Sequence, residues 1–291
     1  MGQKHMVSVV MITYNHEKFI AEAIKGVFMQ KCDFDIEFII ANDKSTDQTN
    51  LKILDCLSKA SIPENIKIEY SNHKQNKGVS KNFIWSLKKS KGKYIALCEG
   101  DDYWTDTLKL QKQVDHMESH PECVLTYHDW RNKTIDGKLD PIKGSTMLLT
   151  LMFRNVIDKF PREFYQAPNG DSFLRTMLKL KGTFNFIDGI SPAVRRMHEG
   201  GVMSMVPMSI KLDRQAKTWL AIYNAFKDSK LGNELFYKKN IFIYTKMLFD
   251  WGLGEGSLIK LIIYPIQVNH LKLYVLFFKT ILGIHIRGTN N

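Results

Sequence analysis

Three carboxylates stand close together immediately after an apolar run in the first half of the chain. Residues 94–98 are typical of a buried parallel strand, and Glu99, Asp101 and Asp102 follow it. Like charges this close repel one another, so the cluster favours a divalent cation. Mg²⁺ and Mn²⁺ prefer hard oxygen ligands and often share them with substrate phosphates. The alternative is a polar loop whose acids cap the following helix, which is the better interpretation of an isolated Asp-Asp pair.

Alternating strand and helix patterns surround this cluster. The expected strands are residues 6–12, 36–41, 66–70 and 93–98, and the expected helices are residues 17–30, 45–60 and 79–90. Ser45 and Gln48 match a capping box at the start of the second helix. Gly100 is expected to let the backbone turn sharply between the carboxylates. Repeated strand–helix units of this kind predict an α/β fold with a doubly wound, mostly parallel sheet.

Polar residues follow the carboxyl ends of the expected strands. They form three clusters, which are Thr13-Tyr14-Asn15, Asp43-Lys44-Ser45 and Glu99-Gly100-Asp101-Asp102. In doubly wound sheets, ligands bind outside the carboxyl ends of the strands. Each cluster alone is an ordinary loop, but three at one edge of one sheet predict a binding site.

Composition and missing motifs narrow the classes of ligand. The 291 residues are 44% hydrophobic and 24% charged, as in a folded protein, and the formal charge of +11 favours an anionic partner. Basic residues are spread out and no nucleic-acid-binding motif is present, so nucleic acid ranks behind a phosphorylated small molecule or an acidic membrane surface. The sequence contains no G-x-G-x-x-G after the first strand, no P-loop and no serine nucleophile elbow. Among the classes of ligand considered, this leaves a phosphate-bearing molecule that carboxylates hold through a metal ion.

The cellular compartment is predicted from cysteine usage and from the start of the chain. The four cysteines contain no C-x-x-C pair, which favours a reducing compartment over a disulfide framework or a zinc site. The first strand begins within about six residues, which leaves no room for a signal peptide. We therefore expect a cytoplasmic protein.

The second half of the chain holds one further candidate loop and a helical region. Asp171 follows a loop and is expected to be the N-cap of a helix near residues 173–180, and short strands are expected at 184–187 and 193–196. From about residue 211 the pattern is helical. Its longest uncharged run after residue 240, residues 261–271, is too short for a membrane span, which needs about 20 apolar residues. Basic amphipathic helices on an anionic membrane, or helices packed on the core or on another subunit, fit this region.

Four motifs resemble those of the family 2 glycosyltransferases of GT-A fold. They are V-S-V-V-M-I-T-Y-N-H (7–16), I-I-A-N-D-K-S-T-D-Q-T (39–49), N-K-G-V-S-K-N (76–82) and A-L-C-E-G-D-D-Y-W (96–104). The similarity is close over residues 7–121 and looser over residues 147–204. It implies a nucleoside-diphosphate-sugar donor, with a UDP-sugar favoured, and Mn²⁺ or Mg²⁺ as cofactor.

The resemblance also implies roles for individual residues. The expected donor-binding residues are Thr13, Tyr14, Asn15, Asp43, Ser45, Asn76, Gly78, Lys81, Asn82 and Asp101. The expected metal ligands are Asp101, Asp102 and His198, while Glu99 stands where the family commonly has Asp. Asp171 matches the general base, which would take a proton from an acceptor hydroxyl in an inverting displacement. The competing interpretation of Asp171 is a plain helix cap. The competing interpretation of His198 is an ordinary polar loop residue.

The implied organisation has three parts. Residues 1–130 form the nucleotide-sugar-binding half of a GT-A domain, 131–210 the acceptor-binding half with the catalytic base, and 211–291 a helical extension with membrane association as one alternative. The expected activity is hexosyl transfer to a glycan or lipid-linked hydroxyl in bacterial surface polysaccharide synthesis, at the inner face of the cell membrane. The C-terminal helices could also mediate oligomerisation. The alternatives are a sugar-phosphate nucleotidyltransferase, whose Gly-Arg-rich phosphate loop is missing after the first strand, and a non-catalytic nucleotide-sugar-binding scaffold.

Overall fold

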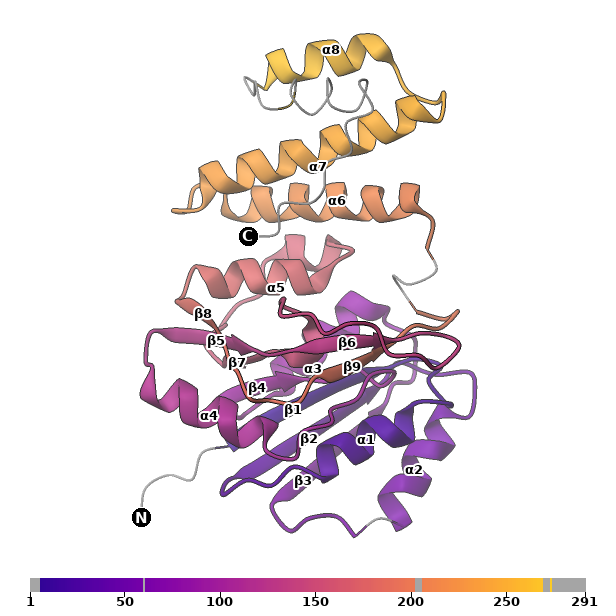
Figure 1. The fold of residues 1–291 in the computed structure, drawn as a ribbon, viewed down its shortest axis with the longest axis vertical. Coiled ribbons are helices and arrows are strands. Elements are labelled where there is room, and N and C mark those ends of the chain that lie inside the picture. The colour runs from indigo at the N-terminus through magenta and orange to yellow at the C-terminus, as the bar shows by residue number, and fades with distance from the viewer. Residues whose placement is uncertain (1–5, 60, 202–205, 269–272, 274–291) are drawn as a thin grey trace. The chain divides into compact units, whose positions relative to one another are not determined.

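The computed structural model describes residues 6–59, 61–201, 206–268 and 273 (Figure 1). These residues fall into two compact units. We call the unit within Met1–Phe160 and Leu174–Met205 the sheet unit, and the unit within Pro161–Phe173 and Val206–Asn291 the helical unit. The part of the predicted C-terminal region that follows residue 268 lies outside the described residues, apart from Leu273.

The sheet unit is built on a seven-stranded sheet with the strand order β3-β2-β1-β4-β7-β5-β8. Four parallel strands hold the predicted motifs: β1 (Met6–Thr13), β2 (Asp35–Asn42), β3 (Ile66–Asn72) and β4 (Tyr94–Leu97). Thr13 pairs with Asn42, and Asn42 with Asn72, so three carboxyl ends are level with one another. The predicted mostly parallel α/β sheet is confirmed.

One antiparallel strand interrupts the parallel order. The three-residue β7 (Met152–Arg154) runs antiparallel to β4 and to β5 (Cys123–Tyr127), and β5 pairs in parallel with β8 (Thr183–Phe186). The sequence analysis missed β7, because three residues are too few for a periodic pattern. A 3-10 turn, Leu148–Thr150, precedes it.

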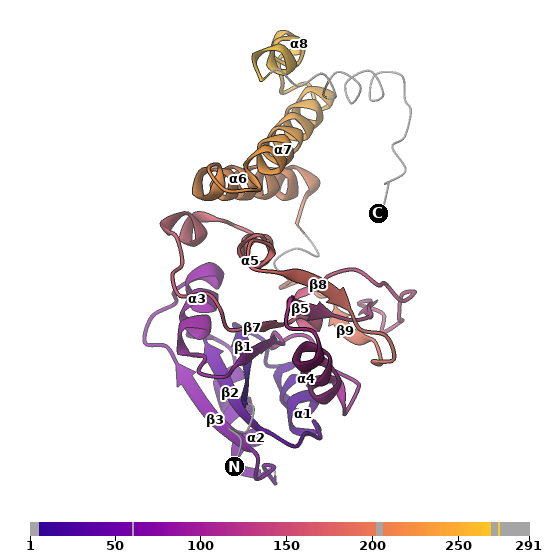
Figure 2. The same cartoon turned by 90° about the vertical axis from the view of Figure 1, so that its left-hand side faces the viewer.

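Helices cover both faces of the sheet (Figure 2). Helices α1 (Ile20–Phe28), α2 (Thr49–Lys59) and α4 (Lys109–Ser119) share one hydrophobic core with alternate residues of the central strands. Helix α3 (Val79–Lys89) packs on β1 and β2 from the opposite face. Because both faces are buried, the central strands read as continuous apolar runs.

A small second sheet lies beside the loop that follows β4. It consists of the parallel strands β6 (Trp130–Lys133) and β9 (Ala193–Arg196). The Tyr103 N–H donates to the Val194 carbonyl at 3.1 Å, and the Val194 N–H donates to the Tyr103 carbonyl at 2.9 Å. This backbone pair brings residues from the end of the sheet unit against the predicted metal-binding acids.

The helical unit contains a 3-10 helix, Arg162–Gln166, and the helices α6 (Met208–Phe226), α7 (Gly232–Gly252) and α8 (Leu258–Gln267). One of the three boundaries between the units along the chain falls within α5 (Gly170–Lys179). Trp219 stacks on Phe242 with ring centroids 5.7 Å apart, and the Tyr244 hydroxyl donates to the Leu261 carbonyl at 2.8 Å. The expected C-terminal helices are thus present. Among the described residues, none forms a helix with both the length and the hydropathy that crossing a bilayer requires.

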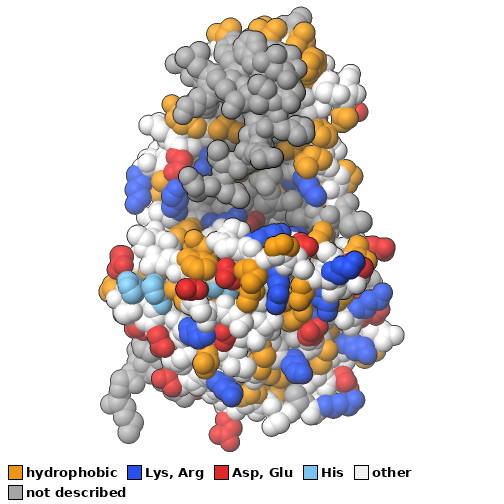
Figure 3. All heavy atoms as spheres, viewed as in Figure 1, with side chains coloured by type: hydrophobic (Ala, Val, Ile, Leu, Met, Phe, Trp, Pro, Cys, Tyr) orange, Lys and Arg blue, Asp and Glu red, His pale blue; other side chains and the backbone are white. Residues whose placement is uncertain are grey.

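Charged side chains are mixed on the surface. On the face drawn in Figure 3, Lys and Arg side chains alternate with acidic and apolar ones and do not gather into one basic stripe. Nucleic-acid-binding surfaces usually concentrate their basic residues. This face therefore offers no such concentrated surface.

Candidate active site

The loops that follow β1 and β2 are bonded to each other. The Asn15 N–H donates to Ser45 Oγ at 3.0 Å, and Asn15 Oδ1 accepts from the Thr46 N–H at 2.8 Å. Asn15 and Lys44 both have a left-handed backbone, with φ of 57° and 61°. This conformation is uncommon outside glycine and is often found at functional sites. Tyr14, beside Asn15, is 43% exposed, and its ring is accessible to a ligand.

Ser45 does not cap a helix. Its hydroxyl donates to Asn42 Oδ1 at 2.6 Å, and α2 begins at Thr49. The Asp47 carboxylate instead accepts the Thr49 N–H at 2.9 Å. The predicted capping box is therefore wrong, because the Ser45 hydroxyl is used to bind the loops together.

Asp43 organises the loop that leads into α3. This carboxylate is 3% exposed and accepts the Lys77 N–H at 2.8 Å on Oδ1 and the Gly78 N–H at 2.9 Å on Oδ2. Asn76 Nδ2 donates to the Asp43 carbonyl at 3.0 Å. Gly78 has φ of 80°, which favours glycine at this position. The predicted donor-binding residues Asp43, Asn76 and Gly78 thus form one rigid corner.

The start of α3 supplies the next two predicted residues. Asn82 is buried, and its Nδ2 donates to the Ala41 carbonyl at 3.0 Å while Oδ1 bonds to His73 Nε2 at 2.8 Å. Lys81 lies exposed in the first turn of α3. An exposed cation near a helix N-terminus suits an anion such as a diphosphate.

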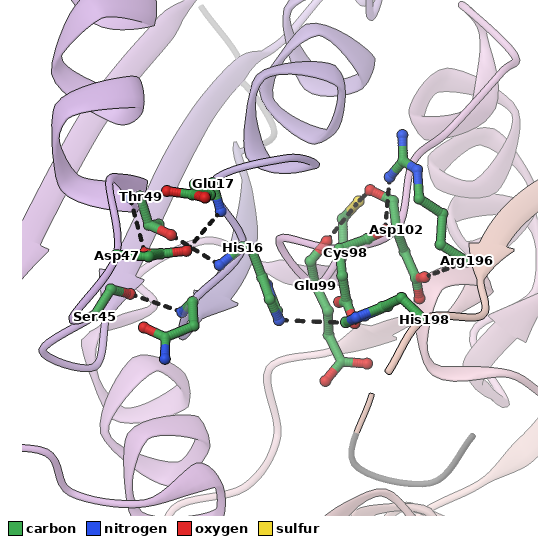
Figure 4. Close-up of polar contacts among 12 residues, drawn as sticks. His16, Glu17, Ser45, Asp47, Thr49, Cys98, Glu99, Asp102, Arg196 and His198 are labelled. Atoms are coloured by element: carbon green, nitrogen blue, oxygen red, sulfur yellow. Dashed lines mark hydrogen bonds and ion pairs between the residues drawn. The ribbon is translucent and has the colours of Figure 1, made fainter. Parts of the chain in front are cut away.

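Asp101, His16 and His198 meet at the carboxyl ends of the strands. His198 Nε2 donates to Asp101 Oδ2 at 3.0 Å, and His16 Nε2 lies 3.8 Å from the same oxygen. In Figure 4, His16 lies on the loop after β1 and His198 on the segment after β9, and their rings are directed toward each other. Ligand atoms of the three residues lie within 4.8 Å of one another. Two imidazoles and a carboxylate are ligands for a divalent transition metal, so this donor set fits the predicted cation.

Asp102 has different surroundings. Its carboxylate is 4% exposed, and Oδ1 accepts the Arg196 N–H at 3.0 Å. It is not a member of the three-residue group that the described residues offer to a metal. Burial, reinforced by the charges of Asp101 and Glu99, raises the pKa of Asp102 well above its ordinary value. The structure therefore brings Asp101 and His198 together, as predicted for the metal site, and turns Asp102 toward the backbone of β9.

Asp101 is held in its ionised form. Burial by itself would raise its pKa, but the hydrogen bond from His198 and the interaction with His16 outweigh burial, and the pKa of Asp101 is lowered. Burial lowers the pKa of His16, so its ring is neutral at physiological pH. An ionised carboxylate and a neutral imidazole are the forms that bind metal ions.

Arg196 fastens the acidic turn to the rest of the sheet unit. Its guanidinium donates to the Asp101 carbonyl at 2.6 Å and forms an ion pair with Glu22 on α1. The same group lies 4.3 Å from the centroid of the Tyr103 ring. Arg196 is only 8% exposed, whereas its ion-pair partner Glu22 is 51% exposed. Its effect is to fix the backbone that presents the Asp101 carboxylate.

A cavity of about 700 Å³ opens beside His198. Its lining includes polar and charged side chains from four segments, among them Asn15, Lys18, Glu22, Asp47, Lys133, Arg196 and His198. The cavity lies wholly within the sheet unit. It is large enough for a nucleotide or a sugar.

Asp171 belongs to the helical unit. Helix α5 begins at Gly170, so Asp171 lies in the first helical turn and not at the N-cap position expected from sequence. Its side chain is partly exposed. A carboxylate in the first turn is favoured by the helix dipole, which gives Asp171 a structural role whether or not it acts in catalysis.

The sequence analysis missed two residues of the site. His16 stands beside Asn15 in the first motif, and its position on the same edge of the sheet was a usable signal. Arg196 gave no signal, because it reaches the acidic turn only through the β6–β9 sheet.

The family assignment follows from a sequence comparison. The sequence model of glycosyl transferase family 2 matches residues 8–179, more than half of the chain. The chain belongs to glycosyl transferase family 2. The match covers all four motifs on which the resemblance rested, except for Val7 at the start of the first, so that prediction is confirmed.

Individual curated proteins resemble parts of the chain. An uncharacterized protein of Mycobacterium bovis is 42% identical over 134 residues, which are 46% of this chain and 38% of that protein. The Escherichia coli UDP-Glc:alpha-D-GlcNAc-diphosphoundecaprenol beta-1,3-glucosyltransferase WfaP is 32% identical over 114 residues, which are 39% of this chain and 42% of WfaP. The chain thus spans about two fifths of the length of these curated relatives.

Solved structures share the fold of this family 2 chain. Staphylococcus aureus TarS 1-349 in complex with UDP has a TM-score of 0.59 at 18% identity, over 93% of this chain and 80% of that one. The mannosyltransferase PcManGT of Pyrobaculum calidifontis, in complex with GDP-Man and Mn²⁺, has a TM-score of 0.56 at 13% identity, over 98% and 89%. The predicted GT-A fold is thereby confirmed.

Proposed function

We propose that this chain is a metal-dependent, inverting glycosyltransferase that moves a hexose from a nucleoside-diphosphate sugar to a hydroxyl group of a glycan or lipid-linked acceptor. The observation that carries the proposal is the group formed by Asp101, His198 and His16 at the edge where the donor-binding loops converge. A UDP-sugar is the favoured donor, because WfaP is named for UDP-Glc and TarS was solved with UDP.

The roles of the donor-binding residues follow from their contacts. The exposed Tyr14 ring can stack on a base, and the rigid corner of Asp43, Asn76 and Gly78 can bound the base or ribose. Thr13, Asn15, Ser45 and Asn82 fix the loops, and Lys81 can pair with the diphosphate. A bound Mn²⁺ or Mg²⁺ would offset negative charge on the departing diphosphate. Asp101 and His198 would hold that ion. Asp102 would fix the acidic turn by accepting the hydrogen bond from the Arg196 N–H.

Asp171 is the proposed general base. A carboxylate can accept the proton of an acceptor hydroxyl while its oxygen forms the new bond to the anomeric carbon. The bond from that carbon to the diphosphate oxygen breaks on the opposite side, which inverts the anomeric configuration. The assignment rests on the family's Gly-Asp pattern at Gly170-Asp171 and on the partial exposure of the side chain.

The proposed setting is the inner face of a bacterial cell membrane. WfaP is named for a diphosphoundecaprenol-linked acceptor, which supports a lipid-linked substrate and a role in surface polysaccharide synthesis here. The positive charge of the chain and exposed apolar residues on α8 support peripheral contact with anionic lipid. We also propose that the chain divides into parts at residues 130 and 210, and that it forms oligomers through the C-terminal helices.

Calorimetric titration of nucleotides tests the proposed donor site. UDP, GDP, dTDP and CMP would be titrated into the wild type and into Asp101→Asn, with and without Mn²⁺. We expect metal-dependent binding of UDP, weakened at least 10-fold in Asp101→Asn because the carboxylate charge is lost. Asp102→Asn, which keeps an acceptor for the Arg196 N–H, should weaken binding less. Absence of nucleotide binding with either metal would contradict the donor site.

Asp171→Asn separates an enzyme from a binding scaffold. We expect this variant to bind UDP and metal like the wild type but to lose sugar release from UDP-sugars, measured with water or a panel of glycan acceptors, by at least 100-fold. If the wild type binds UDP-sugars but transfers no sugar to any acceptor or to water, the scaffold alternative is favoured.

A further inference from the structure

We propose that His16 is a third protein ligand of the metal, and that this second imidazole makes the site selective for Mn²⁺ over Mg²⁺ before any nucleotide binds. The inference rests on the proposed metal-dependent function and goes beyond it, because it adds a ligand and a metal preference. The sequence resemblance assigned the metal only to Asp101, Asp102 and His198.

The first observation is the position of the His16 ring. Its Nε2 lies 3.8 Å from Asp101 Oδ2, which is too far for a hydrogen bond. Ligand atoms of divalent cations stand about 2.1 Å from the ion, so two ligands of one ion are commonly about 3–4 Å apart. The His16 and His198 ring centroids are 5.9 Å apart at an interplanar angle of 89°. The nitrogen and the carboxylate oxygen thus have the spacing of two ligands that share an ion.

The second observation is that the His16 ring lacks a hydrogen bond. The buried Nδ1 has no hydrogen-bond partner among the described residues, and the ring is largely enclosed, with a side-chain exposure of 15%. A buried polar atom without a partner costs about 1–3 kcal/mol. A metal bond would use the other nitrogen, Nε2, which faces Asp101 and likewise makes no hydrogen bond to a described residue.

The third observation is that the backbone of His16 is fixed. Its N–H donates to Thr49 Oγ1 at 2.8 Å, and the neighbouring Asn15 is locked in the left-handed region by its bonds to the loop after β2. Phe19 packs against the His198 ring with centroids 4.6 Å apart. Both imidazoles are therefore positioned without the ion, and little conformational entropy is lost when it binds.

The donor set determines the metal preference. Mg²⁺ favours oxygen ligands and retains several waters, whereas imidazole nitrogen suits transition metals. One imidazole and one carboxylate would discriminate weakly between Mn²⁺ and Mg²⁺. Two imidazoles and one carboxylate favour Mn²⁺ and supply three protein ligands, enough for binding without a diphosphate.

Metal titration of the full-length, nucleotide-free chain tests the inference. MnCl₂ and MgCl₂ would be titrated calorimetrically into the wild type, His16→Gln and His116→Gln. We expect one Mn²⁺ per wild-type chain, with Mg²⁺ at least 10-fold weaker. In His16→Gln the Mn²⁺ dissociation constant should rise at least 10-fold while that for Mg²⁺ changes little. Pulsed electron paramagnetic resonance of bound Mn²⁺ should detect two coupled imidazole nitrogens in the wild type and one in His16→Gln.

His116→Gln is the matched control. His116 and His120 stack at the C-terminal end of α4 with centroids 4.1 Å apart, and form a second histidine pair among the described residues that could attract Mn²⁺. Loss of Mn²⁺ in this variant, unchanged Mn²⁺ affinity in His16→Gln, coupling to a single nitrogen in the wild type, or no Mn²⁺ binding without nucleotide would each overturn the inference. Circular dichroism confirms that the variants are folded.

The outcomes separate this inference from the proposed function. If His16→Gln retains the Mn²⁺ affinity of the wild type and UDP binding stays metal-dependent, the inference fails and the donor site stands. If the wild type binds Mn²⁺ through two imidazoles but binds no nucleotide, the metal site stands and the proposed glycosyltransferase fails.

Discussion

Asp101 and Asp102 are neighbours in the sequence, yet their carboxylates have opposite surroundings. Asp101 accepts a hydrogen bond from His198 and has a lowered pKa, whereas Asp102 is buried against the backbone of Arg196 and has a raised pKa. Two adjacent acids can therefore divide the work between binding a cation and holding the turn that presents it. Such a division is common where environments push the pKa values of two carboxyls apart.

Gly100, between Glu99 and Asp101, is required for a different reason from the one expected. It is absent from the described residues with positive φ, so a sharp turn does not explain it. A Cβ at this position would lie 2.6 Å from Thr13 Oγ1 and 2.8 Å from Thr13 Cβ. Close packing of the acidic turn on the end of β1 therefore demands glycine.

We predict that Gly100→Ala lowers the free energy of unfolding by roughly 1–3 kcal/mol, because the methyl group forces β1 and the acidic turn apart. Urea unfolding followed by circular dichroism measures the change. Gly252→Ala is the control, since a Cβ there meets nothing within 4 Å. Equal stability of Gly100→Ala and the wild type would refute the packing argument.

At the scale of elements, α4 contains a lysine where a core residue is expected. Lys109 is fully buried, and its Nζ donates to Gln113 Oε1 at 2.6 Å and lies 4.1 Å from the centroid of the Trp104 ring. Burial lowers the pKa of Lys109 to about 7. Helix α4 thus packs on the sheet through a lysine whose charged form is disfavoured by burial.

The stability contributed by Lys109 should depend on pH. Between pH 7 and about 10.4 the folded chain holds the neutral amine while the unfolded chain binds a proton, so stability rises with pH by up to about 1.4 kcal/mol per unit. Below pH 7 both states bind the proton and this dependence ends. Urea unfolding of the wild type and Lys109→Met at pH 7, 8 and 9 measures it.

In that experiment the stability of the wild type relative to Lys109→Met should increase as the pH rises. Lys112→Met, on the more accessible side of the same helix, controls for the loss of a lysine. A difference between the wild type and Lys109→Met that stays constant with pH would mean that Lys109 remains charged in the folded chain.

At the scale of the whole molecule, the last described helix of this basic chain, α8, has exposed apolar residues. The formal charge is +11, and the exposed large apolar residues of α8 are Leu258, Ile262, Ile263 and Ile266. Cations and exposed apolar side chains together favour an anionic membrane surface, and the electrostatic part of such binding is screened by salt.

We predict that the full-length chain sediments with vesicles that contain phosphatidylglycerol, and several-fold less with pure phosphatidylcholine or at about 0.5 M salt, where charges are strongly screened. The double change Ile262→Ser/Ile266→Ser should reduce binding, since it removes apolar contact area. Leu139→Ser changes an exposed apolar residue in the sheet unit and is the control. Equal binding to both lipids, or self-association of the chain without any binding, would favour helices that pack on protein.

The sequence by itself determined the elements and the edge at which they act. Apolar runs identified β1 to β4, the polar residues after them identified the binding edge, and the four motifs identified the family. These features are local: strand and helix patterns repeat every two or 3.6 residues, and parallel strands present their carboxyl ends together.

The tertiary structure decided which side chains meet. The choice between Asp101 and Asp102, the approach of His198 to His16 and the use of Arg196 depend on β6–β9 pairing, which joins residues about 60 positions apart. The short antiparallel β7 is likewise defined only by the strands beside it. Asp101 and Asp102 are adjacent in the sequence, but packing gives their carboxylates different surroundings. These surroundings make one carboxylate a candidate metal ligand and the other a structural group.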